Sequence, residues 1–464
     1  MLEKIFKLKE NNTSVKTEII AGLTTFLAMA YILAVNPGML GEAGMDRGAV
    51  FTATALSAAI ATFIMGFFAN YPIALASGMG LNAYFTYTVC LGMGLGDNAW
   101  KIALTAVLVE GIIFIILSLF KFREKLVNSI PANLKYGITA GIGLFITIVG
   151  LKGAGVVTTD AFALPDGSVS SSTLVKLGDF ASPNVVLALI GVLLIAILMV
   201  YKVKGAMLIG IVATWLLGIG AELIGWYEVG GANASLIPNF TASSFLPPSL
   251  APTFFKFDFG YVAQNIVNFA IVVFAFLFVD LFDTVGTLVG VAAKGELLDE
   301  EGKLPRAGRA LLSDAIGTVA GAVLGTSTVT SYVESSAGVA EGGKTGLTAV
   351  TVGVLFLVSL FLSPIFLAIP GFATAPALII VGMLMMSSVT KMSFDGDLAD
   401  SVGGFLAIAV MPFTYSIANG IMFGMLAWVI IKLFSGKIKD ISPVMWVSAA
   451  LFAIRIVTLV LHIA

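Results

Sequence analysis

The sequence predicts an all-α polytopic membrane protein, and two observations indicate this fold class. Of the 464 residues, 58% are hydrophobic and only 11% are charged, whereas roughly a quarter of the residues of a soluble protein are charged. Apolar runs of about 20 residues, the length of a membrane-spanning helix, also recur along the whole chain. A β-barrel would instead show short segments of alternating hydrophobicity.

The first half of the chain is expected to hold seven spans. The Lys-rich start before the first span could imitate a signal peptide, but that segment has no obvious cleavage site and many spans follow it. We therefore expect a retained first span. The seven approximate spans cover residues 17–36, 48–68, 72–94, 101–120, 132–151, 183–200 and 204–225.

The second half is expected to repeat this number of spans. Its approximate spans cover residues 262–292, 307–325, 327–341, 346–363, 371–390, 402–416 and 418–434. Pro412 and the pair Asn419-Gly420 interrupt the last two, which predicts a hairpin of two short helices. A further apolar segment, 443–462, carries Arg455 and fits either an additional span or an interfacial helix.

Lys and Arg predict the orientation of these spans, because cytoplasmic loops carry an excess of both. Basic clusters fall around residues 121–125, 202–204, 294–309 and 432–439, in loops that should share the side of the N-terminus. The long loops 152–182 and 226–260 are poor in Lys and Arg. We expect a multi-pass protein of the cell membrane with a cytoplasmic N-terminus and two long external loops.

Two segments are too polar, too β-branched or too Gly-rich for ordinary spans. They read NYPIALASGMGLN at residues 70–82 and GTSTVTSYVESSAG at residues 325–338, about half a chain apart. Seven spans per half would set the second half inverted relative to the first. Interrupted segments at matching positions in inverted halves indicate a transporter's binding site, because irregular backbone at membrane depth must line a cavity or be buried in protein.

The eighth span keeps two carboxylates within apolar sequence. Asp280 and Asp283 lie three residues apart, on one helix face, and Thr284 extends this polar stripe. An ionised Asp at the centre of a span costs about 2.5–3.5 kcal/mol on insertion scales, so such residues indicate a functional site. Glu334 lies in the second interrupted segment and is a comparable candidate.

Two more acids occur within spans, Asp314 in LLSDAIGT and Glu110 in LTAVLVEGIIF. For both we expect a structural or conformational role, in which buried hydrogen bonds tie helices together.

The charged groups available within the spans favour a small neutral solute with N–H donors, or a cation. No Lys or Arg falls near the centre of a clear span, as an anion carrier would require. A carboxylate accepts hydrogen bonds from the edge of a nucleobase, and burial allows it to exchange a proton near neutral pH. One His and one Cys leave no basis for a metal site, a cofactor or a catalytic triad, so no enzyme is predicted.

One motif, taken alone, would indicate an ATPase. GVAEGGKT, residues 338–345, matches the G-x-x-x-x-G-K-[ST] phosphate loop. That loop requires a buried strand, a helix and a soluble α/β domain. Nothing outside the spans is long enough to supply this domain, so a Gly-rich turn between two spans is expected. Neither a basic stripe nor a charged tail suggests a nucleic-acid partner.

Five stretches together resemble the nucleobase:cation symporter family, closest to its adenine/guanine/hypoxanthine permease branch (AzgA-like). They are EIIAGLTTFLAMAYILAVNP, SGMGLNAYFTY, FDTVGTL, TSTVTSYVESSAGVAEGGKTGLTA and MPFTYSIANGI. The resemblance implies fourteen transmembrane segments as a 7+7 inverted repeat, as in uracil permease, with short strands in segments 3 and 10. It also implies a core domain (1–130 and 260–365) and a gate domain (131–259 and 366–464).

The resemblance further implies proton-coupled uptake of purines (guanine, hypoxanthine or adenine) by movement of the core against the gate, and a homodimer in the lipid bilayer. Its binding acids fall on Asp280 and Glu334, and its polar residue of segment 3 falls on Asn82. Asp283 matches a second acid, and these three acids are the candidates for proton coupling. Phe26, Tyr332, Val333 and Thr284 are expected to complete the substrate site.

Several alternatives stay open from the sequence. They are a xanthine, uracil or other nucleobase carrier, an anion exchanger on the same fold, a passive channel and an intramembrane enzyme. A carboxylate serves H⁺ and Na⁺ equally, so the coupling ion is also left open between the two.

Overall fold

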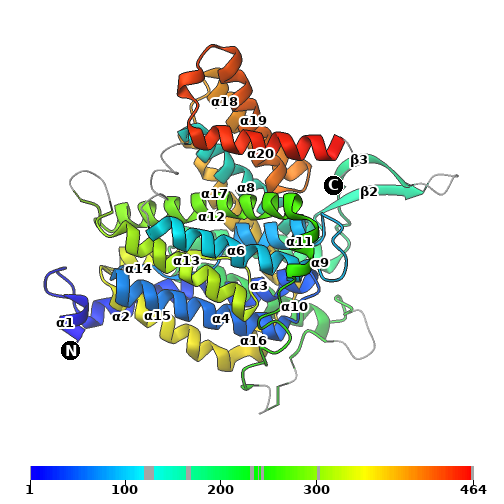
Figure 1. Cartoon of the computed structure of the whole chain (residues 1–464). Coiled ribbons are helices and arrows are strands. Elements are labelled where there is room, and N and C mark those ends of the chain that lie inside the picture. Colours follow the sequence, from blue (N-terminus) through cyan, green and yellow to red (C-terminus); the bar gives the residue numbers. More distant parts are fainter. Residues whose placement is uncertain are drawn as a thin grey trace.

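The computed structural model describes residues 2–119, 130–163, 169–229, 235–238, 240–241, 245–299 and 304–460. Within these ranges, ten helices are long and apolar enough to cross a membrane, and three shorter apolar helices accompany them. With the two interrupted segments, these helices reproduce the fourteen expected spans and one helix beyond them. The all-α polytopic fold is therefore confirmed (Figure 1).

The first half begins with a short helix at the N-terminus and continues through the expected spans. The first span is split at Ala30 and Tyr31 into two helices. The described helices are α1 (Leu2–Phe6), α2 (Val15–Met29), α3 (Ile32–Glu42), α4 (Arg47–Ile64) with the π-helix η1 (Met65–Ala69), α5 (Met79–Ala83) with the π-helix η2 (Tyr84–Cys90), α6 (Ala99–Leu119), α8 (Ala132–Gly153), α9 (Pro183–Val200) and α10 (Ala206–Leu223).

The second half follows the same plan and ends in one further helix. Its described helices are α11 (Phe259–Gln264), α12 (Ile266–Lys294), α13 (Ala307–Leu324), α14 (Ser335–Ala340), α15 (Gly346–Ser359) with η4 (Leu360–Leu362), α16 (Ser363–Ala368), α17 (Gly371–Met386) with η5 (Ser387–Lys391), α18 (Leu398–Phe413), α19 (Ile417–Phe434), η6 (Ile438–Asp440) and α20 (Pro443–Val460).

Each interrupted segment contains a short strand. Strands β1 (Leu75–Ser77) and β4 (Val329–Ser331) pair antiparallel, with Leu75 opposite Ser331 and Ser77 opposite Val329. All residues of both strands are buried. A two-stranded ladder satisfies backbone groups that a broken helix leaves open, which is how irregular backbone persists inside the protein. The strands expected in segments 3 and 10 are confirmed.

The long loop 152–182 contains a feature that the sequence analysis did not predict. Strands β2 (Val157–Ala163) and β3 (Val169–Leu177) form an antiparallel hairpin with an irregular register near Asp160. It projects from the end of the bundle opposite the N-terminus (Figure 1). We call this end the hairpin face and the other end the amino-terminal face.

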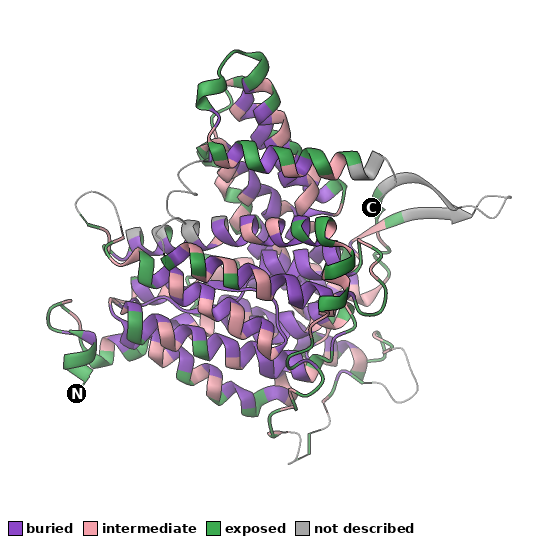
Figure 2. Cartoon of the chain, in the orientation of Figure 1, coloured by how far each residue is buried: buried purple, intermediate pink, exposed green. Residues whose placement is uncertain are grey.

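The helices pack in two groups. In the first, α2, α3, α4, α6, α12, α13, α14 and α15 surround the strand pair β1–β4. In the second, α8, α9, α10, α17, α18 and α19 pack on one another. Buried residues concentrate inside the bundle and exposed ones at its ends (Figure 2). The strand pair therefore lies within the first group.

The C-terminal part contains the expected helical hairpin and α20, but α19 is long enough to cross a membrane, and Asn419 and Gly420 lie within its first turn instead of interrupting it. Helices α18 and α19 are joined by a turn in which Tyr415 adopts a left-handed φ of 51°. Helix α20 packs on both α12 and α19, and the rings of Phe452 and Phe274 lie 5.4 Å apart in an edge contact. It lies alongside α12 in Figure 1, so it contacts both helix groups.

Candidate functional site

Polar side chains of residues 326–331 are each held by a different neighbouring element. The Thr326 hydroxyl lies 2.9 Å from that of Ser77 and accepts a hydrogen bond from Asn36 Nδ2 at 2.9 Å. The hydroxyl of Thr328 donates to Glu110 Oε2 at 2.9 Å. These side chains satisfy one another in a buried environment, where an unpaired polar group is unfavourable. The second interrupted segment is thereby fixed against the first group of helices.

The acids Asp280 and Asp314 meet around one hydroxyl. Thr284 Oγ1 lies 2.9 Å from Asp280 Oδ1, 3.0 Å from Asp314 Oδ2 and 2.8 Å from Thr330 Oγ1. All of these side chains except that of Thr330, which is 1% exposed, are completely buried. Asp314 Oδ1 also accepts from the backbone N–H of Ser331 at 3.0 Å. This network connects α12 and α13 to β4.

Asn82 and Tyr332 hold the two interrupted segments together. Asn82 Oδ1 accepts a hydrogen bond from the hydroxyl of Ser327, whereas Asn82 Nδ2 is buried without a hydrogen-bond partner. The phenol of Tyr332 donates to the carbonyl oxygen of Ser77 at 2.5 Å. Asn82 Nδ2 is therefore a donor that remains available within the site.

A second set of candidate residues is partly exposed. Asp283 and Glu334 are both partly accessible, Phe26 is partly accessible, and the side chain of Val333 is 53% exposed. The carboxyl group of Asp283 lies close enough to those of Asp314 and Glu334 to interact electrostatically with both. Asp283 is therefore a partly accessible acid that connects Glu334 to the buried network, whereas Asp280, on the same face of the same helix, is completely buried in that network.

Asp283 lies close to the first interrupted segment at Gly78, a residue that has no side chain. A Cβ atom at Gly78 would lie 3.6 Å from Asp283 Oδ2 and 2.5 Å from Thr330 Cγ2. The second distance is shorter than real Cβ atoms show, so any larger residue here would displace the Thr330 side chain or the strand that carries it. Gly78 follows β1 and is the N-cap residue of α5, and its backbone N–H donates to the carbonyl oxygen of Thr328 at 3.0 Å.

Tyr31 belongs to the site and was missed in the sequence analysis. Its phenol, which is 1% exposed, donates to Glu334 Oε1 at 2.6 Å. The residue lies at the break between α2 and α3, and α2 packs on α14. The only sequence signal was its place in the quoted stretch EIIAGLTTFLAMAYILAVNP, since apolar periodicity does not reveal a break without Pro or Gly.

The turn at residues 338–345, whose sequence matches the phosphate-loop motif, lies against a carboxylate of the chain itself. Glu18 is completely buried, and it accepts from the backbone N–H groups of Lys344 at 2.9 Å and Thr348 at 3.1 Å. It also accepts from the Thr348 hydroxyl at 2.6 Å. Helix N-termini favour anions, and here Glu18 supplies one. The Gly-rich turn expected between α14 and α15 is confirmed.

The partly exposed set can accept hydrogen bonds and exchange protons. The two carboxylates interact electrostatically, and the partly accessible residues also include the aromatic Phe26 and the aliphatic Val333. Within the described ranges, no group of three or more His, Cys, Asp or Glu side chains is suited to hold a metal ion. The arrangement fits recognition of a flat solute that carries N–H groups.

Full-length relatives and a solved structure resemble this chain. The adenine permease AdeP of Escherichia coli is 43% identical over 462 residues, with 100% of this chain and 97% of AdeP covered. The guanine/hypoxanthine permease PbuO of Bacillus subtilis is 45% identical over 454 residues, with 97% and 99% covered. Both are transporters, so the relatives agree that no enzyme is encoded.

The transmembrane domain of the cyanobacterial bicarbonate transporter BicA has the same fold. Its TM-score is 0.63 at 16% identity, with 88% of this chain and 96% of that domain covered. At this identity the likeness concerns the fold alone, which is the uracil permease-like fold that the resemblance implied. The model of the permease family that includes xanthine and uracil permeases (Xan_ur_permease) matches residues 16–423, and the chain therefore belongs to this permease family.

Proposed function

We propose that this protein is a secondary active transporter that imports purine nucleobases together with protons. The names of its relatives support the purine, since both adenine and guanine/hypoxanthine permeases are more than 40% identical to it over nearly the whole chain. The observation that carries the proposal is the partly accessible carboxylate pair, Asp283 and Glu334, beside the interrupted segments.

In this proposal, Glu334 and Asp283 accept hydrogen bonds from the N–H edge of the base. Phe26 is held edge-on by Phe356, with ring centroids 5.3 Å apart, and it offers an aromatic face to a flat ring. The backbone at Tyr332 and Val333 flanks the base. Asn82 assists from segment 3 through its unpartnered Nδ2.

We assign the proton to the same carboxylates. Glu334 and Asp283 are partly accessible and exchange the proton. Asp280 is buried and acts on them only indirectly, through its hydrogen bond with Thr284. Asp314 and Glu110 hold β4 and the preceding loop in place. A base bound to Glu334 and a proton bound to Asp283 would remove the charge repulsion between them, which couples the two ligands.

The two helix groups support transport by movement of a core against a gate. We propose that the first group, with residues 1–130 and 260–365, is the core. The second group, with residues 131–259 and 366–464, is the gate. In this proposal the amino-terminal face is cytoplasmic, because the basic residues Lys204 and Arg306 lie there, beside Glu341 and Tyr71, and the chain works as a homodimer.

The test is uptake of labelled hypoxanthine, guanine and adenine by proteoliposomes with an imposed proton gradient. We expect saturable accumulation that a protonophore abolishes. Asp283→Asn and Glu334→Gln should each reduce uptake at least about tenfold, since each removes a charged hydrogen-bond acceptor. Glu228→Gln, at an exposed acid after α10, is the matched control and should leave uptake unchanged.

Different failures would remove different parts of the proposal. Accumulation that ignores the protonophore but follows a sodium gradient would replace H⁺ by Na⁺. Flux without saturation would indicate a channel, and absence of uptake of every purine would remove the substrate class.

A further inference from the structure

A cavity whose lining includes neither Asp283 nor Glu334 lies between the two helix groups. It has a volume of about 150 Å³ and is lined by fourteen residues from η2 and its following turn, α12, the α18–α19 turn, α19 and α20. A water molecule requires only about 10–15 Å³ by the same measure, so the space exceeds what a few waters need. The α18–α19 turn belongs to the stretch MPFTYSIANGI, to which no role has been assigned above.

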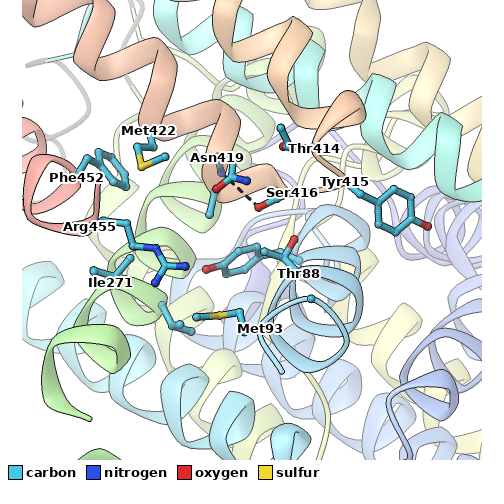
Figure 3. A pocket seen from close by; sticks show the side chains of 14 residues that line it. Thr88, Met93, Ile271, Thr414, Tyr415, Ser416, Asn419, Met422, Phe452 and Arg455 are labelled. Carbon is cyan, nitrogen blue, oxygen red and sulfur yellow. Dashed lines mark hydrogen bonds between the residues drawn. The ribbon is translucent and has the colours of Figure 1, made fainter. Parts of the chain in front are cut away.

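One wall of the cavity is formed by Arg455 of α20. Its Nη1 donates to Asn268 Oδ1 on α12 at 3.4 Å, and the neighbouring Phe452 packs on Phe274. These contacts hold the guanidinium group at the cavity, where it points toward the space between Asn419 and Met93 (Figure 3). A cation of α20, a helix beyond the fourteen spans, is therefore held against α12 of the core, where core and gate meet.

The remaining polar groups around the cavity are hydroxyls and an amide. Thr88 is 7% exposed, and its buried hydroxyl has no hydrogen-bond partner. Ser416 accepts from the backbone N–H of Asn419 at 3.3 Å, which leaves the hydroxyl proton of Ser416 available as a donor. None of the fourteen lining residues is an acid. The cavity thus combines donors with apolar walls from Ile271 and Met422.

We propose that this cavity is a second nucleobase site, which selects 6-oxopurines over 6-aminopurines on the hairpin-face side of the carboxylate pair. A guanidinium group donates two parallel hydrogen bonds to O6 and N7 of guanine, both of which are acceptors. Hypoxanthine presents the same two acceptors, whereas adenine replaces O6 by an amino donor. The donor-rich lining therefore complements guanine and hypoxanthine and opposes adenine.

The site rests on the proposed function, since it requires a purine as the transported solute. Its position supports a place on the entry route. A larger cavity of about 460 Å³ shares Gly92, Thr414 and Tyr415 with it, and Lys152 and Glu42 at the hairpin-face ends of α8 and α3 line that second cavity. A base entering from the hairpin face would pass between core and gate, where Thr88 of the core and Arg455 and Ser416 of the gate line the cavity.

The test is calorimetric titration of the purified full-length protein with hypoxanthine and adenine. The Glu334→Gln substitution weakens binding at the carboxylate pair, so that binding at the second site can be measured. In this background we expect hypoxanthine to bind at least about tenfold more tightly than adenine, as for one bidentate pair. Adding Arg455→Gln should remove this preference, whereas Lys439→Gln, an exposed cation after α19, should preserve it.

A third variant separates hydrogen-bond recognition from charge. Arg455→Lys keeps the charge but lacks the planar fork, so it should lose the preference as Arg455→Gln does. Full preference in Arg455→Lys or Arg455→Gln, with unchanged thermal unfolding, would overturn the proposal, as would competition by inorganic phosphate. If the unmodified protein bound neither purine, the proposed function itself would fail instead.

Discussion

Asp280 and Asp283 are less than one helical turn apart, yet their surroundings differ. Asp280 is completely buried in the Thr284 network, and Asp283 is partly accessible beside Glu334. We therefore predict that Asp280→Asn mainly lowers stability, by about 1–3 kcal/mol for a buried hydrogen-bonded charge. Asp283→Asn should mainly abolish purine binding. Thermal unfolding in detergent and a binding titration on both variants measure the two effects separately, and equal losses in both assays would contradict this division.

Tyr31 is the residue whose role is simplest to isolate. Tyr31→Phe removes only the phenol oxygen that donates to Glu334 Oε1 at 2.6 Å. We predict that the KM for purine uptake rises about tenfold, because a hydrogen bond to a charged group contributes roughly 1.5–3 kcal/mol. Tyr201→Phe changes a tyrosine that is 77% exposed and serves as the control. An unchanged KM would show that Tyr31 does not orient Glu334.

Asp397 permits a prediction on pH, because it lies outside the spanning helices. Its carboxylate accepts from Lys432 Nζ at 2.8 Å and Lys437 Nζ at 2.6 Å, and these two hydrogen bonds lower its pKa. A carboxyl group with a lowered pKa stabilises the fold above the ordinary Asp value of about 3.9 and loses this effect as the pH falls through the folded-state pKa.

Asp397→Asn should therefore lower the unfolding temperature by the same amount throughout pH 5 to 8. This difference should begin to shrink below about pH 4 and disappear only as the pH falls through the lowered folded-state pKa of Asp397. Unfolding temperatures of both proteins across pH measure it, and a difference that grows toward acid would refute the pairing.

The strand pair β1–β4 requires glycine at one position. At Gly78 a Cβ atom would lie 2.5 Å from Thr330 Cγ2, whereas at Gly290 in α12 it would meet nothing within 4 Å. Gly78→Ala should push the strands apart, with a loss of about 1–3 kcal/mol from overpacking, and should abolish uptake. Gly290→Ala should retain both stability and uptake. Normal uptake by Gly78→Ala would mean that the close approach of the strands is dispensable.

Much of the architecture follows from sequence because bilayer thickness fixes helix length and because Pro, Gly and β-branched residues interrupt helices. The two interrupted segments and the α18–α19 hairpin were predicted on these grounds. The β2–β3 hairpin was not, because the sequence 152–182 was treated only as a loop poor in Lys and Arg. The break at Tyr31 also escaped, since no Pro or Gly marks it.

The candidate site was predictable in content but not in geometry. The acids within the spans could be identified from the sequence, because inserting a charged side chain into a bilayer is unfavourable. Which of them faces accessible space depends on how α12 packs against α13 and β4, and helical spacing alone cannot report this. Asp280 and Asp283 share a helix face, yet Asp280 is completely buried, whereas Asp283 is partly accessible and interacts electrostatically with Glu334.

The two helix groups are joined across the amino-terminal face by an ion pair. Lys204, between α9 and α10, lies 2.8 Å from Glu341, which follows α14. On the hairpin face, by contrast, cavities separate the same groups. An exposed pair contributes about 0.2–1 kcal/mol, enough to shift a two-state equilibrium by up to about fivefold. We therefore predict that the pair favours the state that is closed at the amino-terminal face.

Cys90 provides the measurement, because it is the only cysteine of the chain and ends η2 next to Leu91, which lines the larger cavity. Lys204→Glu should slow the labelling of Cys90 by a maleimide up to about fivefold, since it shifts the population away from the state open at the hairpin face. Exchanging both charges, with Lys204→Glu and Glu341→Lys, should restore the rate. Restoration would show that the effect comes from the ion pair and not from a general loss of stability. An equally slow rate in the exchanged protein would show that this ion pair does not stabilise the state closed at the amino-terminal face.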